Sequence, residues 1–284
     1  MSVRILNKPV KDSGSSAEAK STLAEDMELS RALQKLIKKI KGEFTMADGV
    51  DYVRIRSSQL YADFEALTNQ LTSVDLESYS KDERKAFFIN VYNTLTIHGI
   101  VSMAELPDSV LKVQKFWEIT CYQIGAHVFS LDDIEHGILR ANRSHPASVK
   151  PTYFPEGDVR VKYALDTLDP RIHFALNCGA KSCPAISAYD AENLDKALDA
   201  ATKLFCNQEV IVLPKNEEVY VSKLFEWYGS DFGSNDIAAV KWMLPYLDEP
   251  KHSELALLLQ GILSVGAGQV LYNEYDWRLN STFG

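Results

Sequence analysis

The 284-residue sequence lacks the features that would assign it to several large classes of protein. Its acidic residues outnumber its basic residues by 39 to 30, so the formal net charge is −9 and the pI is about 5.2. Nucleic-acid binding generally needs a dense basic surface, which this balance does not supply. The sequence also lacks the run of about 18 apolar residues that marks a membrane-spanning helix. We therefore expect no nucleic-acid partner and no integral membrane segment.

Cysteine is scarce, and its spacing matches no common framework. The sequence contains four cysteines and no CxxC pair. Four in a chain of this length are too few for a disulfide scaffold, and the first residues lack the apolar core of a secretory signal. We expect reduced thiols in a cytoplasmic protein. The four residues are Cys121, Cys178, Cys183 and Cys206.

The common cofactor and metal motifs are missing as well. No GxGxxG, P-loop lysine or HExxH pattern occurs, and the six histidines are scattered singly. The spacing does not require a zinc site, although four residues of the right type can be named for one: His136, His173, Cys178 and Cys183. We expect no cofactor and no metal.

The amino-acid composition, 46% apolar and 24% charged, is that of an ordinary globular protein. Residues 1–16 are polar and expected to be disordered. Residues 17–56 are expected to hold an amphipathic helix and its connection, and residues 57–284 a globular domain. Two hairpins are predicted, one in residues 117–130 around Gly125 and one in residues 210–224 around Lys215-Asn216. Hairpins and helices without regular βαβ alternation predict an α+β fold, with an antiparallel sheet packed against a buried central helix.

The N-terminal helix has one apolar stripe and a cluster of lysines on its other side. Docking on its own domain is the simpler interpretation, because an isolated helix of this length is marginal in water. The alternative is peripheral contact of residues 17–41 with an anionic membrane, or with a partner protein. The stripe consists of Leu29, Leu33, Leu36, Ile37 and Ile40.

Two further segments stand out between residues 80 and 165. Ser80 and Glu83 form a capping box that opens the central helix, Glu83 to Val101. Residues 143–165 contain three prolines and few periodic apolar residues. A structureless stretch of this length inside a compact domain is typical of a functional loop.

The densest unusual segment runs from Asp169 to Pro184. Its alternation predicts a strand with His173 and Asn177 on one face, which is a candidate cleft surface. On a regular strand Cys178 would lie about 17 Å from His173, too far for direct activation unless the chain folds back. Cys183 precedes Pro184 after a turn, so a helix start there would favour its thiolate. The alternative is that both cysteines are small buried hydrophobic residues.

Asn90 and Asn93 lie three residues apart on the otherwise apolar central helix. A buried asparagine without partners costs about 1–3 kcal/mol, so each must be hydrogen-bonded. One interpretation is that they hold loop backbones in place. The other is that they line a site and orient a catalytic group. We expect His173 and Asn177 to meet this polar helix face, because two polar surfaces on apolar elements satisfy each other.

Four blocks of the sequence resemble the DUF547 domain family, whose function is unassigned. They are residues 88–97, residues 131–140, residues 169–178 with 182–184, and residues 275–280, and the resemblance covers about 57–280. The family also occurs in plant leucine-zipper proteins and in animal proteins with glutaredoxin and DEP domains. The sequence has neither a glutaredoxin CxxC nor a long zipper, so those activities are not transferred. The family's recurring residues correspond to Asn90, Tyr92, Asn93, Glu135, His136, Arg171, His173, Asn177, Cys178, Ser182, Cys183 and Pro184.

Two hypotheses follow. In the first, the protein is a cysteine-dependent hydrolase or acyl-transferase with peptidase-like chemistry, with Cys178 or Cys183 as nucleophile and His136 or His173 as base. Asn90, Asn93 or Asn177 would then orient the base or bind the oxyanion. In the second, the domain is a non-catalytic interaction module for a protein or peptide partner. Its asparagine, histidine and cysteine residues would then form a structural polar network.

Overall fold

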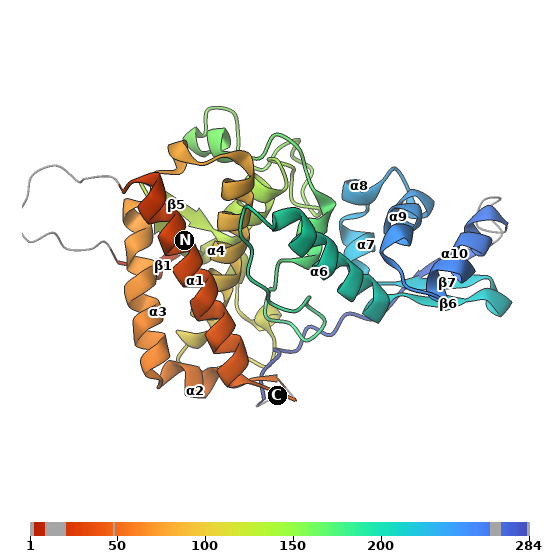
Figure 1. Ribbon diagram of the computed structural model, residues 1–284, viewed down its shortest axis with the longest axis horizontal. Helices are drawn as coiled ribbons and strands as arrows, with labels where there is room; N and C mark the ends of the chain where they lie inside the picture. The colour runs from red at the N-terminus through yellow and green to blue at the C-terminus, as the bar shows by residue number, and fades with distance from the viewer. Residues whose placement is uncertain (1–2, 9–20, 48, 262–267, 283–284) are drawn as a thin grey trace, which may run out of the picture. The chain divides into compact units, whose positions relative to one another are not determined.

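The protein is described by a computed structural model for residues 3–8, 21–47, 49–261 and 268–282 (Figure 1). Helices and small sheets are mixed without βαβ alternation, which confirms the α+β class. The chain divides into two compact units. Unit 1 contains Met1–Asp169, Leu176–Leu194 and Trp277–Gly284, and unit 2 contains Pro170–Ala175 and Asp195–Asp276.

Unit 1 is built around one buried helix. Every residue of this helix, α4, from position 85 to position 101 is buried, as its almost wholly apolar sequence predicted. The helices of unit 1 are α1 (Leu23–Phe44), α2 (Tyr52–Arg56), α3 (Gln59–Asn69), α4 (Lys81–Val101) and α5 (Phe116–Ile119), followed by a π-helix (Asp133–Leu139). Its strands are β1 (Arg4–Ile5), β2 (Thr45–Met46), β3 (Gly49–Val50), β4 (Thr120–Ile124) and β5 (His127–Ser130).

The larger sheet of unit 1 has the strand order β1-β4-β5. The β4–β5 hairpin turns at Gly125, close to the predicted position. Strand β1 adds to β4 in parallel, with Arg4 opposite Thr120. Residues 3–8 thus belong to unit 1, and the rest of the tail predicted for residues 1–16 lies outside the described residues.

Helix α1 packs against α3 and α4 through its apolar stripe (Figure 1). Leu33 is 0% exposed and Ile37 is 1% exposed, whereas Lys35, Lys38 and Lys39 face solvent. The docking predicted from the sequence is confirmed. The apolar surface that a membrane or a partner helix would need is already covered.

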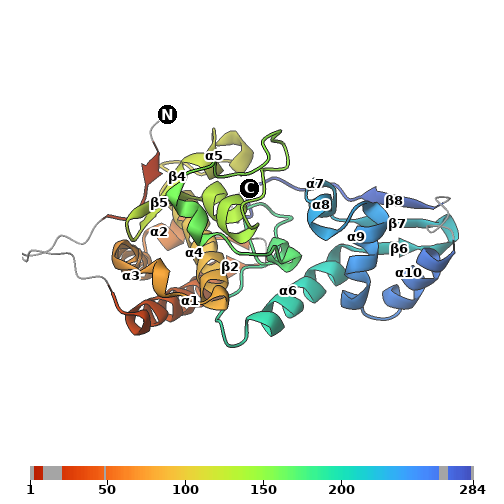
Figure 2. The same ribbon diagram turned by 90° about the horizontal axis from the view of Figure 1, so that it is seen from above.

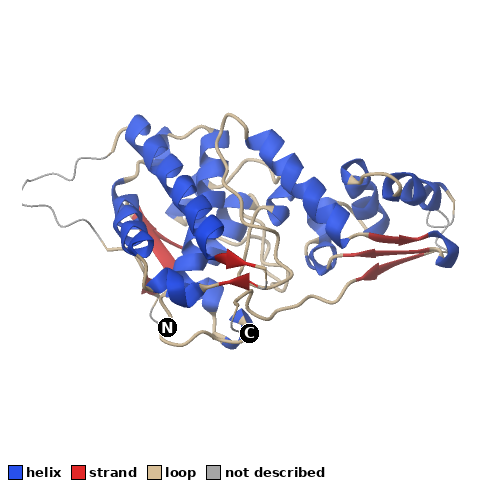
Figure 3. Cartoon of the chain, turned by 60° about the horizontal axis from the view of Figure 1, so that its bottom comes forward, coloured by secondary structure: helices blue, strands red, loops and turns tan. Residues whose placement is uncertain are grey.

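In its described residues, unit 2 combines a three-stranded sheet with several helices (Figure 2). Its strands β6 (Ile211–Leu213) and β7 (Glu218–Val221) form the second predicted hairpin, and β8 (Gln269–Tyr272) pairs in parallel with β7 (Figure 3). A cluster of aromatic rings fills its core, including Phe174, Phe225 and Trp242. The helices are α6 (Leu194–Glu209), α7 (Lys223–Trp227), α8 (Gly229–Phe232), α9 (Asp236–Met243) and α10 (Lys251–Gln260).

The strand predicted across residues 171–178 is wrong. Residues Pro170–Phe174 form a 3₁₀ helix instead. Proline fixes φ near the helical value and has no N–H to pair in a sheet, which suits the first turn of a helix. Ile172 and Phe174, the apolar residues of the alternation that indicated a strand, are buried in this short turn, and so is His173 between them.

None of the helices in the described residues combines the length and the apolarity needed to cross a membrane.

The capping box at the start of α4 is present as predicted. Ser80 Oγ accepts a hydrogen bond from the Glu83 N–H, and the Glu83 carboxylate accepts one from the Ser80 N–H at 2.8 Å. We expect Ser80→Ala to lower the free energy of unfolding by about 1 kcal/mol, because two helix-end donors lose their arrangement. Urea denaturation measures this change. Ser80→Asp, which keeps a capping acceptor, should remain close to wild type, and an equal loss in both variants would contradict the capping role.

Candidate functional site

Cys178 and Cys183 of unit 1 meet across a tight loop. Their Sγ atoms lie 2.7 Å apart, and the Cys178 backbone N–H donates to Cys183 Sγ at 3.3 Å. Both residues are partly exposed, and they are not joined in a disulfide. A donated N–H stabilises negative charge on a sulfur atom. The loop therefore presents one polarised thiol directly beside a second thiol.

Local sequence explains why the chain doubles back here. Asn177 Oδ1 accepts a hydrogen bond from the Gly179 N–H at 2.9 Å, which is an Asx turn. Gly179 has φ of +90°, and a Cβ at this position would lie 2.6 Å from Ile100 Cδ1, so only glycine fits. The Cys183 N–H then bonds to the Ala180 carbonyl at 3.1 Å. These turns bring two residues that are five apart in sequence into contact.

The central helix and the C-terminal segment hold this loop in place. Asn93 of α4 is 0% exposed, and its Oδ1 accepts a hydrogen bond from the Asn177 N–H at 2.9 Å. Asn177 Nδ2 donates to the Pro184 carbonyl at 2.7 Å. Ala180 pairs with Leu279 in an isolated antiparallel bridge. The predicted contact between Asn177 and the polar face of the central helix is confirmed.

Asn90 holds a different segment. Its Nδ2 donates to the Tyr189 carbonyl at 2.7 Å, and its Oδ1 accepts from the Tyr189 N–H at 3.0 Å. This two-bond clamp on a loop backbone is the structural role considered for the asparagines from the sequence. Asn90 and Asn93 therefore fix two separate stretches of chain onto one helix.

Tyr52 lies at the buried side of the thiol loop and was not identified from the sequence. Its hydroxyl donates to Asn280 Oδ1 at 2.7 Å. Burial raises the pKa of Tyr52 well above the ordinary value, and negative charge on Cys183 and Cys178 raises it further. Tyr52 thus stays a neutral hydrogen-bond donor beside the sulfurs. The sequence around Tyr52 contains no pattern that would predict its position beside the two cysteines.

The predicted site residue His173 and the recurring family residue Arg171 belong to unit 2. His173 is buried, with its Nε2 2.9 Å from Asp231 Oδ2 and its ring 4.1 Å from that of Tyr228, centroid to centroid. Arg171 binds Asp195 and Asp199 at 2.6 and 2.8 Å. Because residues 171–174 are helical, the shared strand face predicted for His173 and Asn177 does not exist.

His136 lies on the π-helix of unit 1. Its Nδ1 accepts a hydrogen bond from Arg140 Nη1 at 3.0 Å, since a guanidinium cannot accept one, so the proton of the neutral ring is on Nε2. Nε2 lies 3.9 Å from Asp132 Oδ1. The preceding residue, Glu135, accepts a hydrogen bond from the Tyr92 hydroxyl of α4 at 3.0 Å.

A pocket of about 490 Å³ opens beside His136, on the loop that was predicted to be functional. Its walls include Asp132, His145 and Tyr153. The His145 and Tyr153 rings contact the His136 ring at 4.8 and 5.5 Å, centroid to centroid. The sequence signal for this site was the long proline-containing stretch, whereas Asp132 was not among the predicted site residues.

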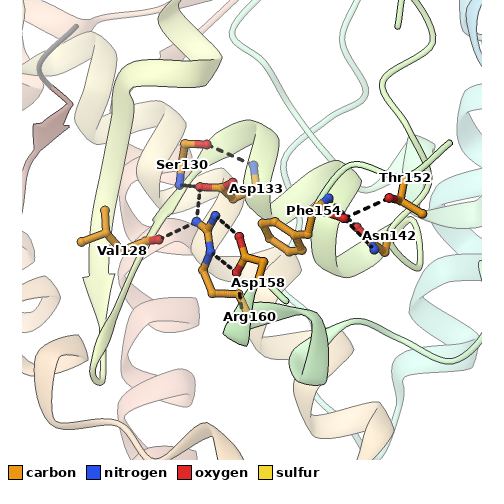
Figure 4. A network of polar contacts seen from close by, with 8 residues as sticks. All are labelled: Val128, Ser130, Asp133, Asn142, Thr152, Phe154, Asp158 and Arg160. Carbon is orange, nitrogen blue, oxygen red and sulfur yellow. Dashed lines mark hydrogen bonds and ion pairs between the residues drawn. The ribbon is translucent and has the colours of Figure 1, made fainter. Parts of the chain in front are cut away.

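One wall of the pocket is fixed by Arg160 (Figure 4). Its guanidinium donates to Asp133 at 2.9 Å, to Asp158 at 2.8 Å and to the Val128 carbonyl at 3.0 Å. It also lies over the Phe154 ring, 4.5 Å from the centroid. The positive charge of Arg160 is therefore balanced by the two carboxylates of Asp133 and Asp158.

Asn142 anchors the loop at Phe154, the residue whose ring packs against Arg160. Its Oδ1 accepts from the Phe154 N–H at 2.7 Å, and its Nδ2 donates to the Phe154 carbonyl at 3.4 Å (Figure 4). A Cβ on Gly137 would lie 2.2 Å from the Phe154 ring, so the ring can pack against residue 137 only because that residue is glycine. The pocket is therefore built from specific contacts within unit 1.

The helix start predicted at Cys183 is wrong. Residues 181–183 form a turn, residues 184–190 are irregular, and the next helix is α6. The segment from 177 to 183 forms its hydrogen bonds locally and with the C-terminal segment, which takes the place of a helical first turn. The group that polarises the Cys183 sulfur is thus the Cys178 N–H and not a helix end.

One known family matches part of the chain. Residues 76–206 match the family model described as "Protein of unknown function, DUF547". A DUF547 domain is thus present over these residues, a narrower range than the 57–280 expected from the resemblance. No curated protein and no solved structure matches the chain. Within the described residues, no cluster of three or more histidine, cysteine, aspartate or glutamate side chains could hold a metal ion.

The four cysteines are expected to differ sharply in reactivity. Burial raises the pKa of Cys121 and of Cys206 to about 12, so both are almost entirely thiols at neutral pH. We expect an alkylating maleimide to label Cys183 and Cys178 at pH 7 at least about tenfold faster than the other two. Peptide mapping by mass spectrometry measures the four rates. Equal rates would remove the basis for a reactive thiol in this loop.

Proposed function

We propose that the protein is a thiol-dependent oxidoreductase in which Cys178 and Cys183 cycle between a dithiol and a disulfide. The observation that carries this proposal is the contact between two partly exposed sulfurs, one of which accepts a backbone N–H. The substrate class is a disulfide, of a small thiol or of a protein. This proposal refines the cysteine nucleophile expected from the sequence and changes its reaction class.

The reaction proceeds in two balanced steps. The Cys183 thiolate attacks one sulfur of a substrate disulfide, forming a mixed disulfide and releasing the first substrate thiolate. The Cys178 thiolate then attacks the Cys183 sulfur, forming the Cys178–Cys183 disulfide and releasing the second substrate thiolate. The substrate gains two electrons, and the protein pair is oxidised by the same two. A cytoplasmic setting, as proposed from the sequence, supplies thiols such as glutathione that restore the dithiol.

Acyl transfer at the same cysteines is supported less well. It needs a base and an oxyanion donor in addition to the nucleophile. His173 is bonded to Asp231 in unit 2, and His136 Nδ1 accepts from Arg140. The amides of Asn90 and Asn177 hold backbone groups of Tyr189, Pro184 and Gly179. Disulfide exchange requires only a thiolate and a second thiol within reach.

Equilibration of the full chain in glutathione buffers of varied redox ratio tests the proposal. The protein is quenched in acid, alkylated, and analysed by mass spectrometry. We expect two thiols, Cys178 and Cys183, to be lost and regained reversibly as the ratio changes. The control variant Cys121→Ser/Cys206→Ser should show the same transition.

Two other results would contradict the proposal. If all four thiols remain alkylatable in the most oxidising buffer, the cysteines are inert and the interaction-module hypothesis is favoured. If Cys183 instead becomes acylated by an activated ester and the thioester turns over, the hydrolase hypothesis is favoured.

A further inference from the structure

The pocket beside His136 contains an acidic group whose charge is not matched. Asp132 lines this pocket of about 490 Å³, and its side chain is 15% exposed. Its nearest basic group in the described part of the chain is His136 Nε2 at 3.9 Å, beyond hydrogen-bond length. A nearly buried carboxyl group is costly to ionise without a partner, so a ligand that supplies positive charge would favour its ionised form.

The other charges of the pocket do not compensate Asp132. Arg160 is matched by Asp133 and Asp158. Glu118, also on the lining, pairs with Lys115. Lys150 is exposed at the pocket rim, where water screens it. Asp132 is therefore the lining carboxylate left to interact with a bound cation.

The remaining walls suit an organic cation. The pocket volume lies within the usual range for small-molecule sites, about 300–1,000 Å³. Tyr153 and His145 present aromatic rings to it, and aromatic faces attract alkylammonium groups within about 6 Å. His136 is held by Arg140 on one side and packs against both rings on the other. It fixes the orientation of the aromatic walls and so serves as a positioning residue.

We propose that this pocket binds a small organic cation, with Asp132 as its counter-ion and Tyr153 and His145 as its aromatic walls. The site is separate from the proposed thiol chemistry and does not depend on it. Recognition would use the charge and the apolar substituents of an alkylammonium group together.

The site predicts a defined pH dependence of binding. Burial first, and then the charges of Glu135, Glu118 and Asp133, raise the pKa of Asp132 to about 8, against a lowering effect of Lys115. The groups that face it are these four side chains together with His136 and Tyr153. A cation binds the deprotonated form, so affinity should rise with pH up to this value and level off above it. The rise is about tenfold per pH unit well below the pKa, because only the deprotonated fraction is competent.

Titration calorimetry with benzyltrimethylammonium, whose charge does not change with pH, tests the proposal on the full chain. We expect binding that strengthens about tenfold between pH 6 and 7 and is nearly constant above pH 9. Asp132→Asn should weaken binding at pH 8.5 at least about tenfold and abolish the pH dependence. Glu156→Gln, a change of an exposed carboxylate on the same loop, should leave both unchanged.

Three outcomes would overturn the assignment. The first is equal binding of the neutral control benzyl alcohol, which would show that charge is not recognised. The second is wild-type binding that does not change with pH, a result that needs no variant to fold. The third is a pH dependence that persists in Asp132→Asn, which would assign the titration to the histidines.

Discussion

Replacing Cys183 with serine is expected to slow the reaction of the protein with glutathione disulfide on the order of 100-fold or more, because a hydroxyl does not supply the attacking thiolate. Replacing Cys178 with serine should leave the first step nearly unchanged. The group that stabilises the Cys183 sulfur is the backbone N–H of residue 178, which the substitution retains. Rapid-quench kinetics, followed as the thiol released, measure both rates.

The same two variants should also differ in their products. With Cys178 absent, the second step cannot occur, and the reaction should stop after one released thiol. With both cysteines present, two thiols should be released. The single variants Cys121→Ser and Cys206→Ser are matched controls, since both residues are buried thiols outside the loop, and they should behave as wild type. Equal rates for Cys178→Ser and Cys183→Ser would contradict the assigned roles.

Asn93→Ala is expected to lower the free energy of unfolding by about 2–4 kcal/mol, which combines a cavity in the core with an unsatisfied buried N–H. The donor left without its acceptor is the Asn177 N–H, at the start of the thiol loop. Thermal or urea denaturation measures the loss. The loosened loop should also form its intramolecular disulfide more slowly.

Asn216→Ala provides the control for this change. Asn216 lies in the exposed turn before β7, with a single side-chain hydrogen bond of 3.4 Å to Glu218. We expect its removal to change stability by no more than about 0.5 kcal/mol. A similarly small effect for Asn93→Ala would mean that the central helix does not anchor the loop.

Sequence patterns predicted the elements whose signals are local. The capping box at Ser80, the almost wholly apolar run of α4 and the two hairpins each depend on residues close together in sequence, and each is present. The apolar stripe of α1 was sufficient to predict that this helix packs against its own domain, because a repeated apolar face requires a surface to cover it. The strand expected at 171–177 failed because Pro170 and the aromatic core of unit 2 favour a single helical turn for the same alternation.

The sequence indicated which residues belong to the thiol site, but it indicated only part of their arrangement in space. Cys178, Cys183, Asn177 and Asn93 lie together because one Asx turn and one left-handed glycine reverse the chain, and the Asn-Cys-Gly sequence carries that signal. The pairing of His173 with Asp231 spans 58 residues, so no local pattern encodes it. The raised pKa of Asp132 likewise depends on burial and on neighbours from α5 and the π-helix, which only the folded chain brings together.

The most direct test of the thiol proposal is the identity of the cysteine that forms the mixed disulfide. The Cys178→Ser variant is reacted with glutathione disulfide, quenched in acid, digested, and mapped by mass spectrometry without reduction. We predict a single glutathione adduct on the peptide that contains Cys183, which dithiothreitol removes. An adduct on Cys121 or Cys206, or no adduct on Cys183 while the variant remains folded, would contradict the proposal.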